Sequence, residues 1–260
     1  MKQNKFILTI SIIIFLFQNN VAVAETLSTK IKSQNIAPIT SPVLITVKSY
    51  PLTETKNIET NKTVGQPVIT TTKLGTVKVD IGDEQGTMEI NVLNSTVNGK
   101  SQNIKFGMLA NIQKNGKLSD IRVNNYPDNV TTSSQKSAID ISFKSLISSL
   151  EDLSLTYPEH GFTKDYQSNI KSQMMGLDIA FQYSTAGLYE WKDRKALALN
   201  LDVKIDGAEV KGTGEGYVLI DIEKGAILYE IQTMIFFVGK KSDVLMEFQT
   251  EKTLDVSTWQ

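Results

Sequence analysis

Apolar residues recur at every second position over most of the chain from about residue 73 onward. This is the period of a β-strand that buries one face. Short turn signals, such as Asn115-Gly116, Asp206-Gly207 and Glu223-Lys224-Gly225, separate the alternating stretches. Strands joined by such short turns pair antiparallel, because a parallel pair needs a long crossover. The pattern therefore predicts an antiparallel sheet.

One segment breaks this period. Between residues 132 and 155 the apolar residues recur with helical spacing, and they are Ile139, Phe143, Leu146, Ile147, Leu150 and Leu153. Thr132 and Gln135 can form a capping box at the start of this helix. The chain is therefore predicted to be an α+β protein. We expect a strongly curved antiparallel sheet, either a half-barrel or a sandwich, with one main amphipathic helix (about 132–155) packed on it.

The chain begins with the three parts of a secretory signal peptide. Lys2 and Lys5 precede an uncharged apolar stretch over 6–17, and small residues follow at 21–24. We interpret 1–24 as a signal peptide and predict an exported protein, periplasmic or secreted. No later stretch is apolar enough to span a membrane as a helix, so no span is expected after signal cleavage.

Residues 25–70 are rich in Thr, Lys, Asn, Ser and Pro. This composition buries little apolar surface, so an extended linker or arm is predicted, with a short strand over 43–47. Residues 71–260 are predicted to form a single β-rich domain.

Composition excludes several functions. The formal net charge is −1, and the chain lacks the basic stripe of a nucleic-acid-binding protein. There is no Cys, and His160 is the only histidine, which disfavours thiolate metal sites and His-dependent nucleophilic catalysis. The carboxylates at turns, namely Asp80, Asp83, Glu84, Asp221 and Glu223, are interpreted as ordinary turn residues. We predict no catalytic residue, cofactor or metal site. A carboxylate pair assembled by folding would escape this reasoning.

Two strands are apolar on both faces, over 217–220 and 234–238. Such a strand needs a cover on each side. The helix can cover one side, and the other requires a second sheet layer, a partner protein or an apolar ligand. The predicted ligand contacts are large side chains of these strands and the strand that follows them, namely Tyr217, Leu219, Ile235, Phe237, Met246 and Phe248.

The stretch from Leu177 to Phe248 combines long strands with Gly212-x-Gly214-x-Gly216, interpreted as a bulge or bend, and with an Asp221-x-x-x-Gly225 hairpin. In this it resembles bacterial exported β-rich proteins and, more distantly, the periplasmic lipoprotein-carrier half-barrel. The second resemblance implies a hollow that holds acyl chains, and it transfers no individual residue.

The leading hypothesis is a non-catalytic periplasmic protein that binds an apolar ligand, a lipid or acyl chain, or a protein partner in the hollow of the sheet. The alternative is a structural or envelope-assembly protein that pairs its sheet edges with another envelope protein. An outer-membrane barrel is disfavoured because the helical segment interrupts the strand pattern.

Overall fold

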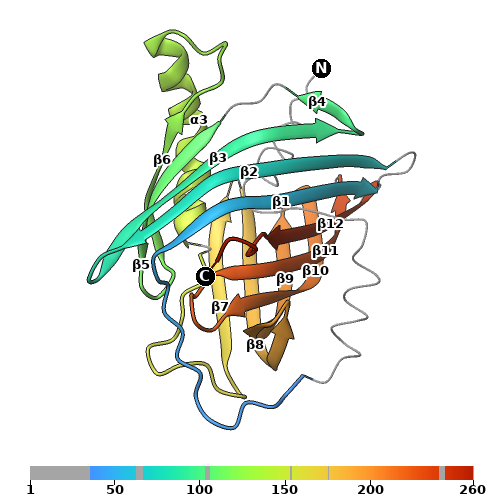
Figure 1. Cartoon of the computed structure of the whole chain (residues 1–260). Helices are drawn as coiled ribbons and strands as arrows, with labels where there is room; N and C mark the ends of the chain where they lie inside the picture. Colours follow the sequence, from blue (N-terminus) through green and yellow to red (C-terminus); the bar gives the residue numbers. More distant parts are fainter. Residues whose placement is uncertain are drawn as a thin grey trace.

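The computed structural model describes residues 36–62, 67–102, 106–152, 154–174, 176–239 and 244–259. The predicted signal peptide, 1–24, lies outside them. The strands and the helix of this part of the chain are β1 (Tyr50–Lys62), β2 (Val68–Ile81), β3 (Gln85–Val97), β4 (Lys100–Gln102), β5 (Gly107–Gln113), β6 (Leu118–Asn125), α3 (Ser133–Asp152), β7 (Gln167–Met174), β8 (Leu177–Trp191), β9 (Arg194–Gly207), β10 (Val210–Asp221), β11 (Ile227–Val238) and β12 (Val244–Leu254) (Figure 1).

All twelve strands belong to one antiparallel sheet, as the alternation predicted. Its order is β6-β5-β3-β2-β1-β12-β11-β10-β9-β8-β7, with β4 paired to β3. Two meanders, one before α3 and one after it, are joined where β1 pairs with β12. Turns fall at predicted positions: Gly116 and Gly225 adopt positive φ, which glycine tolerates without strain.

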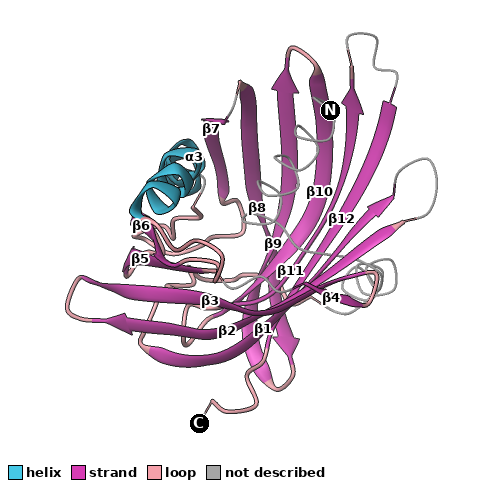
Figure 2. Cartoon of the chain, turned by 90° about the horizontal axis from the view of Figure 1, so that it is seen from above, coloured by secondary structure: helices cyan, strands magenta, loops and turns pink. Residues whose placement is uncertain are grey.

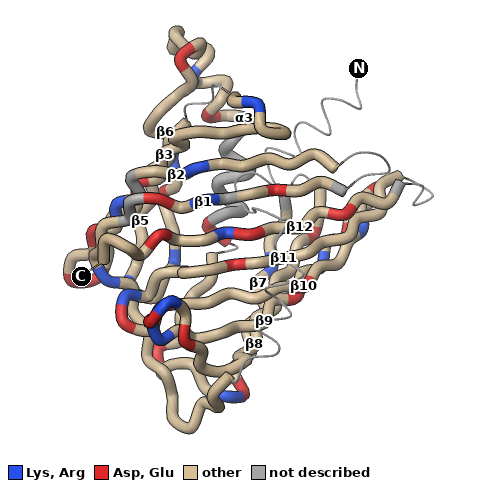
Figure 3. Tube along the Cα trace, turned by 45° about the vertical axis from the view of Figure 1, so that its right-hand side comes forward, with Lys and Arg blue, Asp and Glu red and all other residues tan. Residues whose placement is uncertain are grey.

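The sheet is strongly curved. Seen from above, its strands follow an arc, and α3 lies between the two ends of that arc (Figure 2). Lys and Arg positions are interspersed with Asp and Glu positions along the described strands (Figure 3).

The helix forms where it was predicted but packs elsewhere than expected. Its capping box is present: the Gln135 amide donates to Thr132 Oγ1 at 3.2 Å, and the Thr132 amide donates to Gln135 Oε1 at 3.0 Å. However, α3 packs against β6 and β7, the two edge strands, and not on a face of the central strands. The prediction of a main amphipathic helix covering the sheet is therefore wrong. The reason is topological, because a helix that connects the two edges of a curved sheet lies in the gap between them. The predicted apolar face from Phe143 to Leu153 lies outside the described side chains.

Residues 50–62, within the segment predicted to be an arm, form β1. This strand is internal, paired on one side with β2 and on the other with β12. Residues 36–49 do run as an extended segment, with bridges from Ala37 to Leu188 and from Val43 to Phe162 in place of the strand expected over 43–47. Ile39, Ile45 and Val47 are buried, so this segment contributes to the core.

No helix within the described residues combines the length and apolar character that crossing a bilayer requires.

Candidate functional site

Strand register divides the residues of β1 and β8–β12 between two faces. Gly214 on β10 pairs with Val203 on β9 and with Met234 on β11, and Met234 pairs with Phe248 on β12. Directly paired residues project from the same face of a sheet. We call the face that carries these four residues the inner face, and the opposite one the outer face.

The inner face is the concave one. Figure 2 shows that the sheet follows an arc. Along β9 and β10 the outer-face side chains Asp202, Thr213 and Glu215 are exposed, whereas Val203 on the inner face is buried. The inner face therefore lies on the inside of the arc.

The inner face is apolar across β8 and β9 and along one end of β11 and β12. Its buried apolar side chains there include Ile179, Phe181, Leu201, Val203, Met234, Phe236 and Phe248. The rings of Phe236 and Phe248 meet edge to face, with their centroids 5.4 Å apart. These side chains form a continuous apolar surface on the concave side, and each of them is at most 7% exposed.

Gly212, Gly214 and Gly216 lie on the inner face of β10. A Cβ at Gly214 would come within 2.5 Å of Met234 Cγ, and one at Gly212 within 2.7 Å of Phe236 Cδ1. The glycines therefore leave space in which side chains of β11 lie over β10. No bulge forms at these glycines, because β10 keeps its register with β9 throughout and with β11 until a shift at Leu219/Ile220. The alternative, a bend of the strand at the glycines, stays a prediction.

A polar row crosses the inner face beside the apolar surface. Glu59 on β1 pairs with Thr250 on β12, which pairs with Gln232 on β11. Glu59 is 8% exposed and Thr250 is 1% exposed. Burial raises the pKa of Glu59 from its usual 4.5 to about 7. The row thus holds a carboxyl group that becomes neutral more readily than an exposed one.

Two atoms near Glu59 lack partners. Within the described part of the chain, Thr250 Oγ1 and Asn61 Oδ1 are buried without a hydrogen bond. Asn61 is two residues from Glu59 on the same strand and pairs with Phe248, so it belongs to the inner face. Buried polar atoms are normally hydrogen-bonded, and those that are not call for an explanation.

The other inner-face carboxylate is compensated. Gln232 Nε2 donates to Glu230 Oε1 at 3.2 Å, and Lys252 Nζ lies 3.9 Å from Glu230 Oε2. Glu59 has no comparable hydrogen bond or ion pair among the described residues. Glu59, Thr250 Oγ1 and Asn61 Oδ1 are therefore the buried polar groups of this face that lack a compensating partner among the described residues.

The six predicted ligand contacts do not share one face. Met246 and Phe248 lie on the inner face, through their pairs with Phe236 and Met234. The remaining four, Tyr217, Leu219, Ile235 and Phe237, lie on the outer face. There Leu219 is buried and Tyr217 half-buried, whereas Ile235 is 40% exposed and Phe237 is 43% exposed. At this end of β11 the outer face is therefore not covered, although a cover on both faces was expected. Apolar residues on both faces of a strand do not by themselves show which face is buried. Ligand contact by these six side chains stays a prediction.

Glu59 and Asn61 were missed because they lie in the predicted arm. Along β1 the inner-face positions include Thr55, Glu59 and Asn61, so the strand shows no apolar alternation there. Its abundant Thr, a residue that favours strands, was the available signal.

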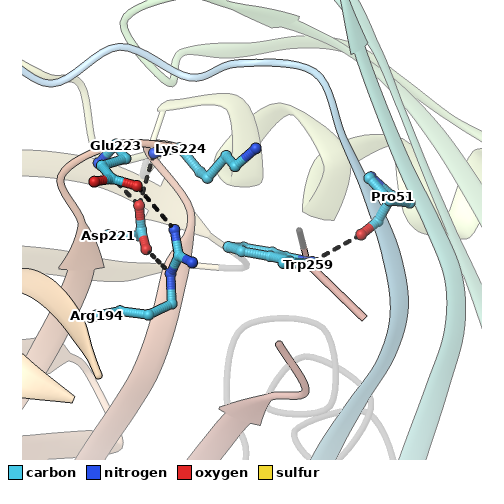
Figure 4. Close-up of polar contacts among 6 residues, drawn as sticks. All are labelled: Pro51, Arg194, Asp221, Glu223, Lys224 and Trp259. Atoms are coloured by element: carbon cyan, nitrogen blue, oxygen red, sulfur yellow. Dashed lines mark hydrogen bonds and ion pairs between the residues drawn. The ribbon is translucent and has the colours of Figure 1, made fainter. Parts of the chain in front are cut away.

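The acidic turn residues Asp221 and Glu223 belong to a structural cluster (Figure 4). Asp221 Oδ1 accepts hydrogen bonds from the amides of Glu223 and Lys224, at 2.9 and 2.7 Å. Arg194 Nε donates to Asp221 Oδ2, and its guanidinium lies over the Trp259 ring. With its acceptor sites engaged, Asp221 fixes the turn between β10 and β11. Across the described residues, no three His, Asp or Glu side chains are grouped so that they could hold a metal ion.

No family model matches the chain. No curated protein matches it. A solved structure described as a candidate lipoprotein of Parabacteroides distasonis is 12% identical, with a TM-score of 0.38, covering 85% of this chain and 100% of that one. A second, described as a candidate exported protein of Bacteroides fragilis with a YmcC-like fold, is 11% identical, with a TM-score of 0.32, covering 83% of this chain and 99% of that one. These two similarities agree with the predicted weak resemblance to bacterial exported β-rich proteins. They assign no function to the chain. The likeness to the lipoprotein carrier stays a prediction.

Proposed function

We propose that this protein is exported, is non-catalytic and binds an acyl or alkyl chain against the inner face of its sheet. The observation that carries the proposal is the continuous apolar surface on the concave side. In it Met234 and Phe236 lie over the space left by Gly212 and Gly214. Apolar contact area is the main source of affinity for such a ligand.

The placement of α3 supports this proposal. The helix packs against the edge strands, so within the described residues it is not the element that covers the inner face of β10–β12. Met234, Phe236 and Phe248 are 1%, 7% and 2% exposed, so an alkyl chain lying along these strands would contact them by replacing the atoms that now cover them.

The alternative, pairing of a sheet edge with a partner, has less support. The amide of Ile121 on the edge strand β6 already donates to Glu151 Oε1 at 2.9 Å, and that of Leu118 donates to Ser154 Oγ at 3.3 Å. Strand addition needs free edge amides, and part of this edge is occupied by α3.

Photolabelling with a diazirine-bearing alkyl probe tests the proposal. The probe is added to the mature protein, irradiated, and its adducts are located by peptide mass spectrometry. Because neighbouring residues of β11 lie on opposite faces, the strand contains its own control. Adducts on Met234 and Phe236 are expected. Adducts confined to Ile235 and Phe237, or none that excess unlabelled dodecanol competes away, would contradict the proposal.

A further inference from the structure

Beside the apolar surface, the inner face carries a small polar group of side chains that we call the Glu59 cluster: Glu59, Asn61 and Thr250. Glu59 and Thr250 are paired across β1 and β12, and Asn61 is paired with Phe248. The cluster is therefore continuous with the apolar surface at Phe248.

Most unpartnered atoms of the cluster are acceptors. The ionised Glu59 carboxylate and Asn61 Oδ1 only accept hydrogen bonds, a Thr hydroxyl can do either, and the Asn61 Nδ2 group is a donor. Thr250 Oγ1 and Asn61 Oδ1 have no partner in the described structure. Leaving a buried acceptor unsatisfied costs about 1–3 kcal/mol. A ligand group that donates hydrogen bonds would remove this cost.

Charge also limits the ligand. Lys252, the inner-face cation beside this row, lies next to Glu230, which Gln232 also contacts. Above the Glu59 pKa of about 7, an anionic head group at the cluster would face the Glu59 carboxylate in a buried site, where like charges repel strongly.

We infer that the Glu59 cluster binds the head group of the amphiphile, and that this head is a hydrogen-bond donor without negative charge, a hydroxyl or an ammonium group and not a carboxylate or phosphate. The alkyl chain then lies along Phe248, Met234 and Phe236. This inference rests on the proposed function, since it assigns the polar end of the same ligand.

A series of probes that share a dodecyl chain tests the inference: dodecylglycerol, dodecylammonium, laurate and dodecyl phosphate. Binding to the mature protein is measured by calorimetry at a pH near 8, below the critical micelle concentration of each probe. We expect the hydroxyl and ammonium probes to bind at least about 10-fold more tightly than the two anions, a difference of about 1.4 kcal/mol.

Two variants separate the cluster from the rest of the protein. Glu59→Gln removes the charge and supplies a donor, so the preference against laurate should fall to about 3-fold or less. Glu215→Gln is the matched control, because Glu215 is exposed on the outer face of β10 and should keep the wild-type ratio. Circular dichroism checks that both variants fold.

The outcomes distinguish the two proposals. If laurate binds the wild-type protein as tightly as dodecylglycerol does, the head-group inference is wrong, while binding of the chain stands. If none of the four probes binds, the proposed function itself is overturned. Should Glu59→Gln not fold, Thr250→Val replaces it and should weaken dodecylglycerol binding at least about 3-fold, without a comparable effect on laurate.

Discussion

Glu59 is the residue whose position departs most from what its chemistry favours. Carboxylates are seldom buried without a partner, because removing the charge from water is costly. Here the side chain is 8% exposed, on a strand in the middle of the sheet. Its raised pKa shows that the folded protein favours the neutral form.

This predicts a dependence of stability on pH. The pKa of Glu59 is about 7 in the folded protein and 4.5 ordinarily, so the folded state binds the extra proton between these values. Stability from this group is full below about 4.5 and is lost as the pH rises through 7. The loss is on the order of 3 kcal/mol. Urea denaturation at pH 5 and pH 8 should show it.

Glu59→Gln should remove this loss, leaving the variant more stable than the wild-type protein at pH 8. Glu215→Gln should follow the wild-type curve, since that side chain is exposed. A variant curve parallel to that of the wild-type protein would show that Glu59 is not destabilised by burial.

At Gly214 the neighbouring strand β11 leaves no space for a side chain. A methyl group at Gly214 would meet Met234 Cγ at 2.5 Å and the Thr233 carbonyl oxygen at 2.7 Å. Gly214→Ala should therefore lower the free energy of unfolding by about 1–3 kcal/mol. Thr213→Ala, at the exposed neighbouring position on the outer face, should change it by no more than about 0.5 kcal/mol. Equal effects of the two substitutions in chemical denaturation would contradict the assignment of the faces.

At the scale of elements, α3 connects the two edges of the sheet. Its C-terminal end accepts the Ile121 amide of β6 through Glu151, and the Asp152 carboxylate accepts a hydrogen bond from Ser172 Oγ of β7 at 3.2 Å. Edge strands expose unpaired amides that invite aggregation, and side chains from a helix can cover them. Side chains at the end of α3 thus accept hydrogen bonds from both edge strands of the sheet. The sequence pattern of the helix did not predict this role.

Glu151→Ala should loosen this connection. The Ile121 amide loses its acceptor, which should lower the free energy of unfolding by about 1 kcal/mol and speed hydrogen exchange at Ile121. Glu151→Gln keeps a side-chain oxygen that can accept the same bond, and should retain most of the protection. Unchanged exchange at Ile121 in the alanine variant would show that this contact does not hold the edge.

At the scale of the whole molecule, residues from the two ends of the described chain meet. β1 pairs with β12, and the tail after β12 carries Trp259 back to the start of β1. Trp259 Nε1 donates to the Pro51 carbonyl oxygen at 2.9 Å (Figure 4). The ring centroid of Trp259 also lies 5.0 Å from that of Tyr50. The contacts hold the junction between the two meanders.

Substitutions of Trp259 should separate the contribution of its hydrogen bond to Pro51 from that of its ring contact with Tyr50. Trp259→Ala removes both the ring and the donor, and should cost about 2 kcal/mol of unfolding free energy. Trp259→Phe keeps an aromatic ring beside Tyr50 and should cost about half of that. Equal loss in both variants, measured by chemical denaturation, would show that ring packing contributes nothing here.

The sequence by itself determined the alternating strands after about residue 73 and the start of the helix, but not β4 or β7. Alternation, turn glycines and the capping box act between neighbours along the chain, which is why they can be recognised locally. Only the tertiary structure decided that the polar residues 50–62 form a central strand, that α3 connects the two edges, and that Met246 and Phe248 share a face with Glu59. Each of these depends on pairing between distant residues, such as Glu59 with Thr250, whose register no local pattern encodes.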